Sequence, residues 1–276
     1  MRVVGKGLVD RNRVLGFTFG GQSFEGFAGD TLASALLANG QRLVGRSFKY
    51  HRPRGIVTCG SEEPNALVTV ARGLAREPNS RATMLPLYDG LVAMPQNAWP
   101  SLKCDALAIN DVLAPFLSAG FYYKTFMWPR KFWEWVYEPA IRRAAGLGAL
   151  STRYDDEIYE KAYAHCDVLI IGAGPSGLMA ALTAGRAGLD VILADEHDQL
   201  GGRLLSEMEY IDGMPAVAWV QAVLAELSGL ASVRIMANTT VTGAYDQGVF
   251  GALERVGPGL QAIPDGLPRE TFWRIY

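Results

Sequence analysis

The segment that decides the fold runs from Asp167 to Asp195 and reads DVLIIGAGPSGLMAALTAGRAGLDVILAD. Residues 168–171 form a short, continuous apolar run of the kind that a strand buried on both faces needs. Glycines follow without a gap, and a helix-length segment then leads to a second apolar run, residues 189–194. The order strand, glycine turn, helix, strand predicts the opening of a Rossmann-type, doubly wound α/β domain.

The glycines of this segment have different predicted roles. Gly172 turns the chain tightly, Gly174 allows the backbone to approach a diphosphate, and Gly177 lets the helix lie close to the strand. Amides at a helix N-terminus, that of Ser176 among them, have no partner within the helix. The spacing therefore predicts a diphosphate at this turn.

The residues after the second apolar run complete the candidate site. Asp195 lies about 20 residues beyond the glycines, at a surface-facing strand end, where an acid can bind the adenosine ribose and disfavour the extra phosphate of NADP. His197 is either an adenosine contact or a solvated loop histidine. Gly202 belongs to a glycine pair that passes close to the cofactor in flavoprotein-type folds, and Arg203 could offset diphosphate charge. The same turn serves NAD and FAD, and Asp195 favours NAD.

The composition is that of a globular protein. Hydrophobic residues make up 49% of the 276 residues and charged residues 20%, which excludes a disordered chain. The length favours two ordinary domains over one large one. With 26 basic and 28 acidic residues the net charge is −2, so no overall field favours nucleic acid or an anionic membrane.

Cysteine usage and the N-terminus bear on the compartment. The three cysteines, Cys59, Cys104 and Cys166, are widely separated, which is neither a disulfide framework nor a zinc pattern. The start lacks the apolar core of a signal peptide, and no window holds about 18 uninterrupted apolar residues. We therefore expect a soluble, cytoplasmic protein without a membrane partner.

The first part of the chain has the pattern of a β-grasp domain. Two aromatic-rich strands, residues 14–19 and 22–27, flank a pair of glycines, which predicts a hairpin with a two-residue turn. Asp30 is placed to cap a helix that begins at Thr31 and ends at Gly40. A hairpin followed by a helix and a loop is the opening of the β-grasp fold, which plant-type ferredoxins share.

The loop after this helix differs from that of a ferredoxin. Closely spaced cysteines hold the two-iron cluster there, whereas Cys59 stands alone in this chain. One thiolate cannot hold such a cluster, so we predict a ferredoxin-like domain without its redox centre. Residues 68–71 and 83–85 are predicted to be its closing strands.

Positive charges gather just before Cys59, and they admit two interpretations. One is an anion clamp or a subunit-docking loop, and the other, slightly favoured because no glycine cradle accompanies them, is a solvated basic loop. The residues concerned are Arg42, Arg46, Lys49, Arg52 and Arg54.

Residues 96–160 are predicted to connect two domains, 1–95 and 161–276. Prolines interrupt regular structure in this segment, and aromatic residues crowd into 121–128 and 132–137. An exposed aromatic cluster usually marks an interface with another chain, and an aromatic plug between the two domains is an equally good interpretation.

The last part of the chain continues the Rossmann-type pattern without completing it. Residues 215–227 predict an amphipathic helix, 233–237 a third strand, and 248–256 an antiparallel excursion. A third strand end is where a backbone can hydrogen-bond the adenine, which makes Val241 a candidate contact. A doubly wound domain needs a further strand and helices, so we expect the chain to be a fragment.

Taken together, these stretches resemble the N-terminal part of the alpha subunit of heterotetrameric sarcosine oxidases. The matching stretches are RSFKYHRPRGI (46–56), GSEEPNA (60–66), GAGPSGL (172–178), ADEHDQLGG (194–202) and NTTVTG (238–243). The resemblance implies a ferredoxin-like domain followed by a domain that holds NAD noncovalently. By this resemblance the NAD contacts fall on Ser176, Asp195, Glu196, His197, Arg203 and Val241.

The resemblance also implies an activity for the whole complex. In that family, beta, gamma and delta subunits complete the enzyme, which uses FAD, FMN and tetrahydrofolate to convert sarcosine to glycine. No nucleophile, acid–base pair or metal cluster stands out in this chain, so we predict no catalytic residue and no metal site. Two alternatives remain. One is the alpha subunit of a related amino-acid or opine dehydrogenase or hydrogen cyanide synthase, and the other is a non-catalytic dinucleotide-binding scaffold.

Overall fold

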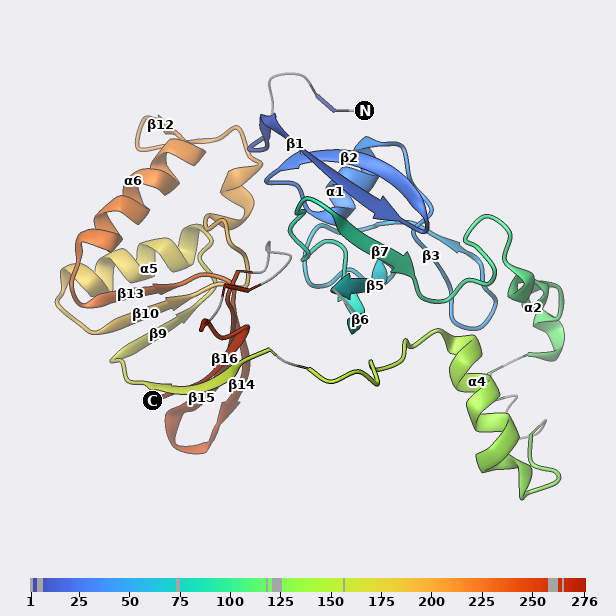
Figure 1. Ribbon diagram of the computed structural model, residues 1–276. Helices are drawn as coiled ribbons and strands as arrows, with labels where there is room; N and C mark the ends of the chain where they lie inside the picture. Colours follow the sequence, from blue (N-terminus) through green and yellow to red (C-terminus); the bar gives the residue numbers. More distant parts are fainter. Residues whose placement is uncertain are drawn as a thin grey trace. The chain divides into compact units, whose positions relative to one another are not determined.

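The computed structural model divides the chain into two compact units, Met1–Asp155 and Asp156–Tyr276, which are described separately (Figure 1). The residues of the predicted connecting segment up to Asp155 are grouped with the first unit. The described residues are 2–3, 7–72, 75–117, 119–120, 126–155, 157–257, 263–264 and 266–276.

A five-stranded sheet forms the centre of the first unit. Its order is β2-β1-β7-β5-β6. Strands β1 and β7 are parallel to each other, and the other neighbouring strands are antiparallel. The elements are β1 (Asp10–Phe19), β2 (Gln22–Ala28), α1 (Leu32–Ala38), β5 (Leu67–Arg72), β6 (Ala75–Arg81) and β7 (Leu91–Pro95). This topology confirms the predicted β-grasp fold.

The hairpin and its packing follow from the sequence. Gly20 and Gly21 have φ values of 57° and 80°, which the two-residue turn requires and which favour glycine. Alternate residues of β1 are buried, Phe17 and Phe19 among them, and they pack in one core with Leu32 and Leu36 of α1. The alternating apolar side chains of the strand and the apolar face of the helix therefore pack in one core.

The helix cap lies one residue later than predicted. Thr31 is the N-cap, because its Oγ1 accepts from the Ser34 amide at 3.2 Å while Ser34 Oγ accepts from the Thr31 amide at 3.0 Å. Asp30 is buried instead beneath this turn, where it accepts from the Phe27 amide and the Ser34 hydroxyl. The prediction of Asp30 as the cap was therefore wrong.

One closing strand was also predicted wrongly. Residues 83–85 form a turn, and the strand is β6, whose sequence AREPNSR shows no apolar alternation. Because β6 lies at the edge of the sheet, Pro78 removes no bond that an inner strand would need. Alternating apolar residues indicate buried strands, so this pattern does not reveal an exposed edge strand such as β6.

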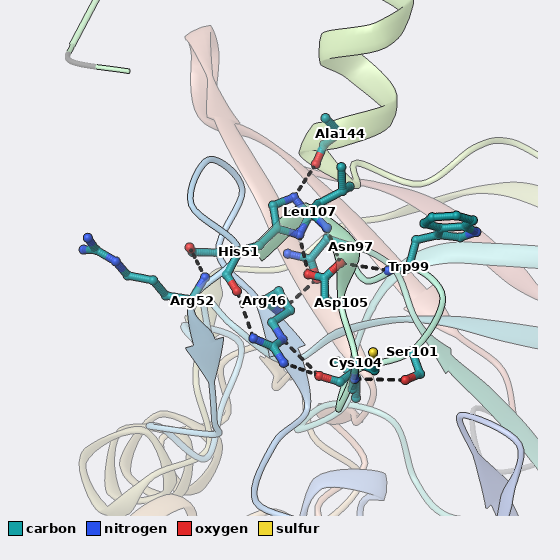
Figure 2. Close-up of polar contacts among 12 residues, drawn as sticks. Arg46, His51, Arg52, Asn97, Trp99, Ser101, Cys104, Asp105, Leu107 and Ala144 are labelled. Carbon is teal, nitrogen blue, oxygen red and sulfur yellow. Dashed lines mark hydrogen bonds and ion pairs between the residues drawn. The ribbon is translucent and has the colours of Figure 1, made fainter. Parts of the chain in front are cut away.

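Arg46 of the basic stretch and the nearby His51 attach the following segment to the β-grasp domain (Figure 2). The guanidinium of Arg46 donates to the carbonyls of Leu102 and His51. The buried His51 ring lies between two oxygens, with Nδ1 2.6 Å from Asp105 Oδ2 and Nε2 3.0 Å from Ala144 O. For Arg46 the solvated interpretation is wrong, because its guanidinium donates to carbonyls within the unit.

The remainder of the first unit consists of short elements. In it, Trp128 and Trp135 are 84% and 82% exposed, while residues 121–125 of the predicted aromatic cluster lie outside the described residues. The elements are β3 (Gly45–Arg46), β4 (Pro53–Arg54), η1 (Ala106–Ala108), α2 (Ile109–Val112), η2 (Ala114–Phe116), η3 (Trp133–Tyr137) and α4 (Glu138–Ala145).

A parallel sheet with the order β13-β10-β9 organises the second unit. Its strands and the helices α5 and α6 match the predicted order of elements, and the Rossmann-type fold class is confirmed. Their bounds are β9 (Val168–Ile171), α5 (Pro175–Arg186), β10 (Val191–Ala194), α6 (Ala216–Gly229) and β13 (Val233–Met236). Gly188, with φ 80°, follows the end of α5 as expected.

The middle strand β10 is buried on both faces, whereas Ile171 at the end of β9 is 60% exposed. Val191 and Leu193 pack in the core formed with α5 and α6, whereas Ile192 and Ala194 pack against a four-stranded sheet. This second sheet has the order β14-β15-β16-β8, with β16 and β8 parallel. Its strands are β8 (Tyr159–Ala164), β14 (Thr239–Tyr245), β15 (Val249–Arg255) and β16 (Glu270–Ile275). The smaller elements are η4 (Gly202–Leu205), β11 (Tyr210–Ile211), β12 (Met214–Pro215) and η5 (Asp246–Gly248).

A search of the described residues for a helix that is long and apolar enough to cross a bilayer finds none.

Candidate functional site

The glycine turn between β9 and α5 combines one closed and one open position. A Cβ on Gly177 would lie 1.9 Å from the carbonyl oxygen of Gly172, so the helix and the strand end approach too closely for any side chain. A Cβ on Gly174 would meet no atom within 4 Å. Gly172 itself has φ 96°. The turn is therefore tightly packed at Gly177, where the helix meets the strand, and has open space beside Gly174.

The N-terminus of α5 adjoins this open position. Gly174 is the N-cap without a side-chain hydrogen bond, and Pro175 occupies the first helical position, where a missing amide proton costs nothing. The first helical bond is donated by Leu178 to the carbonyl of Gly174, so the described contacts leave the Ser176 and Gly177 amides without an acceptor. An anion above Gly174 would meet unpaired amides and the positive end of the helix dipole.

Asp195 is tied to the same turn rather than facing solvent. Its Oδ2 accepts from the Ala173 amide at 2.6 Å, its Oδ1 accepts from the His197 amide at 2.9 Å, and its side chain is only 11% exposed. Burial alone raises the pKa of this carboxyl, but the bonds from His197 and Ala173 outweigh it and hold the pKa below its ordinary value. The expectation of a surface-facing strand end was therefore wrong.

His197 is oriented by Asp195. Its Nδ1 lies 3.0 Å from Asp195 Oδ1, and its side chain is 45% exposed. The bond to Asp195 raises the pKa of His197, burial opposes this, and the nearby carboxylates of Glu196 and Asp198 add to the rise. The backbone carbonyl of His197 also accepts from the Asn238 amide, which joins this loop to the connection between β13 and β14.

The second pair of glycines packs against the first turn. Gly201 donates its amide to the carbonyl of Ala173 at 2.9 Å, and a Cβ on Gly202 would lie 3.1 Å from Gly174 Cα. Arg203 points to a different partner, because its Nε lies 2.7 Å from Glu207 Oε1 and its side chain is 71% exposed. The structure thus places Gly202 against the glycine turn, whereas the Arg203 charge pairs with Glu207, four residues further along the chain.

Val241 lies on β14, beyond the end of the third parallel strand. Its half-buried side chain packs in the core between the two sheets, and in the sheet it stands opposite Ala252. The start of β14 is close to Asp195, since the Thr239 amide donates to the Asp195 carbonyl at 2.7 Å. Sequence reasoning missed Ala173 and Thr239, because both act through backbone amides that leave no side-chain signal.

Two family models match the chain, one in each unit. A family described as "2Fe-2S iron-sulfur cluster binding domain" matches residues 12–98. A family described as "FAD dependent oxidoreductase" matches residues 167–249, which include the whole glycine turn and the Asp195 loop.

Sarcosine oxidase alpha subunits are similar along nearly the whole chain. The "Sarcosine oxidase subunit alpha" of Rhizobium meliloti (strain 1021) is 59% identical over 274 residues, which are 99% of this chain and 28% of that subunit. The subunit of the same name from Corynebacterium sp. (strain P-1) is 35% identical over 97% of this chain and 23% of its own length. The chain thus spans about a quarter of the length of these relatives.

A solved structure has the same succession of folds. The L-proline dehydrogenase from P. horikoshii superposes with a TM-score of 0.57 and 20% identity over 96% of this chain and 39% of that one. At this identity the likeness concerns the fold alone.

The donor set of the first unit does not fit the iron–sulfur cluster that its family description names. A two-iron cluster is held by four thiolates. Residues 12–98 contain Cys59 as their one cysteine, and it is exposed. Within the described residues no three His, Cys, Asp or Glu side chains form a metal-binding group.

Proposed function

We propose that this chain, which belongs with the alpha subunits of sarcosine oxidase, binds an adenine dinucleotide at the turn formed by residues 172–177. The observation that carries the proposal is the contrast between Gly177, where no Cβ fits, and Gly174, where open space adjoins unpaired amides at the start of α5. Such a turn can accept a diphosphate by its backbone alone.

The proposed ligand is NAD, held by the candidate residues of both loops. The amides of Ser176 and Gly177 would donate hydrogen bonds to the diphosphate, and Gly172 and Gly202 would keep side chains away from it. Asp195 would bind the adenosine ribose with the lone pair that its two backbone donors and the His197 ring leave free, since a carboxylate accepts about four hydrogen bonds. Glu196, His197 and the backbone of Val241 would surround the adenosine, and Arg203 would have to leave Glu207 to reach the phosphates.

FAD is the second candidate for the same turn. The match of residues 167–249 to a family of FAD-dependent oxidoreductases favours it, and the glycine motif serves both dinucleotides. When bound, NAD would supply hydride chemistry and FAD one- or two-electron chemistry. In either case the contribution of this chain is to bind and orient the cofactor.

Mass spectrometry of the nucleotide released on denaturation distinguishes the two cofactors. The full-length subunit is purified with its partners and denatured, once as wild type and once with Gly174→Ala. We expect NAD in the wild-type extract and its loss in the variant, while other nucleotides stay at wild-type levels. Loss of FAD instead would assign this turn to FAD, and unchanged extracts would contradict the proposal.

For the whole complex we propose sarcosine oxidase activity in the cytoplasm, with beta, gamma and delta subunits as partners. The 59% identity to a sarcosine oxidase alpha subunit supports this. The reaction would take sarcosine, tetrahydrofolate and oxygen to glycine, methylenetetrahydrofolate and hydrogen peroxide, with FAD, FMN and folate bound outside this chain. Glycine and peroxide formed in equal amounts from sarcosine, and not from proline, would support it. A preference for proline or an opine would favour the dehydrogenase alternative.

A further inference from the structure

The loop that would carry an iron–sulfur cluster in a ferredoxin is centred here on one buried carboxylate. Glu63 is 1% exposed, although glutamate is almost never fully buried without partners. Its Oε2 accepts from the Val57 amide at 2.9 Å and from the Thr58 amide and hydroxyl at 2.8 and 3.1 Å. Its Oε1 accepts from the Asn65 amide at 2.8 Å. Four donors from both sides of the loop thus converge on one side chain.

These donors are sufficient to keep Glu63 ionised. Burial alone raises the pKa of the carboxyl, but the bonds from Thr58, Asn65 and Val57 outweigh it and lower the pKa below its ordinary value. None of the ion pairs found among the described residues involves Glu63. The negative charge is therefore balanced by backbone dipoles, as at an anion-binding nest.

The same loop is fixed to the rest of the domain. The Glu63 amide donates back to the Gly60 carbonyl, and the buried Thr83 hydroxyl donates to that carbonyl at 2.8 Å. Thr83 belongs to the turn that was predicted as a strand, so this turn supports the loop.

In a two-iron ferredoxin the cluster and its four thiolates are the anion that accepts hydrogen bonds from the surrounding loop. This chain has three cysteines in all, and one of them lies in the matched domain. A loop with converging, partly buried amides and no cluster needs another anion, because amides that are shielded from water and lack an acceptor cost free energy. Glu63 meets this need from within the loop.

We propose that the Glu63 carboxylate takes the place of the iron–sulfur cluster as the anionic centre of this loop. The domain then folds without iron and carries no electrons, and any electron transfer in the complete enzyme bypasses it. Its family description, which names a cluster, does not apply to this chain.

The iron content of the wild-type protein tests the second half of the proposal. The full-length protein is incubated anaerobically with ferrous iron, sulfide and a thiol, desalted, and assayed for iron and acid-labile sulfide. The proposal predicts substoichiometric iron and sulfide, at the level of a control treated without sulfide. Two irons and two sulfides retained per chain, with a cluster spectrum that dithionite bleaches, would overturn it.

Glu63→Gln tests the first half, with Glu62→Gln as the matched control because Glu62 is the exposed neighbour of the same type. Amide hydrogen exchange of a peptide covering residues 55–66 is measured by mass spectrometry. We expect exchange to accelerate about tenfold or more in Glu63→Gln, since hydrogen bonds to a charged acceptor are among the stronger ones, and to stay at the wild-type rate in Glu62→Gln. Equal exchange in the two variants would overturn the proposal.

If Glu63→Gln fails to fold, Glu63→Asp provides the comparison because it keeps the charge on a shorter side chain. A folded Glu63→Asp with intermediate exchange supports a requirement for the carboxylate. An unfolded Glu63→Asp beside a folded Glu63→Ala would show that the charge is not what holds the loop, and would overturn the proposal.

Discussion

Among single residues, Asp195, which is proposed to bind the ribose, also has a structural role. Its carboxylate holds the Ala173 amide of the glycine turn and the His197 amide of its own loop. Replacing it would therefore disturb the turn as well as the proposed ribose contact, because a buried amide left without an acceptor costs about 1–3 kcal/mol. Loss of binding in an Asp195 variant alone would not separate these two effects.

His197 offers a cleaner test, since it is half-exposed and its link to Asp195 depends on pH. The folded-state pKa of His197 is raised, so its pairing stabilises the fold fully below about pH 6.5 and is lost as the pH rises through the folded-state value. The pKa of Asp195 is lowered, so the pair remains intact on the acid side until that carboxyl is protonated.

We expect the free energy of unfolding of the wild type to exceed that of His197→Gln at pH 6, and the difference to shrink by pH 8.5. Urea denaturation of the two proteins at both pH values measures it. Glu196→Gln removes one of the smaller contributions to the raised pKa of His197, so it is expected to weaken the pH dependence less than His197→Gln does. A difference that grows with pH would show that His197 is neutral when paired.

Among the elements, the connection from β9 to α5 has the least tolerance for change. A Cβ on Gly177 would lie 1.9 Å from the Gly172 oxygen, which is backbone and not the end of a flexible side chain, so Gly177→Ala must separate the helix from the strand. We expect a loss of about 3 kcal/mol or more in unfolding free energy, at the upper end of the range for overpacked sites. Chemical denaturation followed by circular dichroism measures this loss.

Gly229→Ala is the matched control, in the same unit and near the end of α6. Its Cβ would meet no atom within 4 Å and its φ is not positive, so the fold should keep or slightly gain stability. Equal stability of the two variants would mean that helix α5 does not lie against the strand end as described.

The strength of local signals explains which elements the sequence predicts. The path from β9 through α5 to β10 carries an apolar run, glycines at fixed spacing and a helix stop within one short segment, and it is found where expected. By contrast, β8 and β16 were missed. They pair with each other although most of the second unit separates them in the sequence, and local patterns do not show such a long-range pairing. Edge strand β6 was missed because solvent covers one side of it and its alternation is lost.

The candidate site also has one part that the sequence predicts and one part that it does not. Glycines and Asp195 are visible in the sequence because the fold needs these residue types at these positions. The tie between Asp195 and the turn is not visible, since its partners are the amides of Ala173 and His197, which any residue type could supply. The sequence places both Glu207 and a possible phosphate within reach of Arg203, and it does not show which of them Arg203 binds. In the structure Arg203 pairs with Glu207.

At the level of the whole chain, the two units have separate cores. The core of the first unit includes Leu36 on α1, and that of the second includes Leu227 on α6. Both side chains are fully buried, so truncation to alanine should cost about 2–5 kcal/mol in each case.

We expect calorimetry to resolve two transitions, with Leu36→Ala lowering one midpoint and Leu227→Ala the other. A protein with two independent cores does not unfold in a single two-state step. If either variant lowers both midpoints by the same amount, the units unfold as one and the division after Asp155 has no thermodynamic meaning.

The most direct test of the proposed binding is Gly174→Ala, titrated with NAD and in parallel with FAD by calorimetry. A Cβ here enters open space at a negative φ, so the fold should change by no more than about 1 kcal/mol. The same Cβ would occupy the space assigned to the diphosphate, and we predict that the affinity for the bound dinucleotide falls at least about tenfold, or about 1.4 kcal/mol. An unchanged dissociation constant in a folded Gly174→Ala protein would contradict the account.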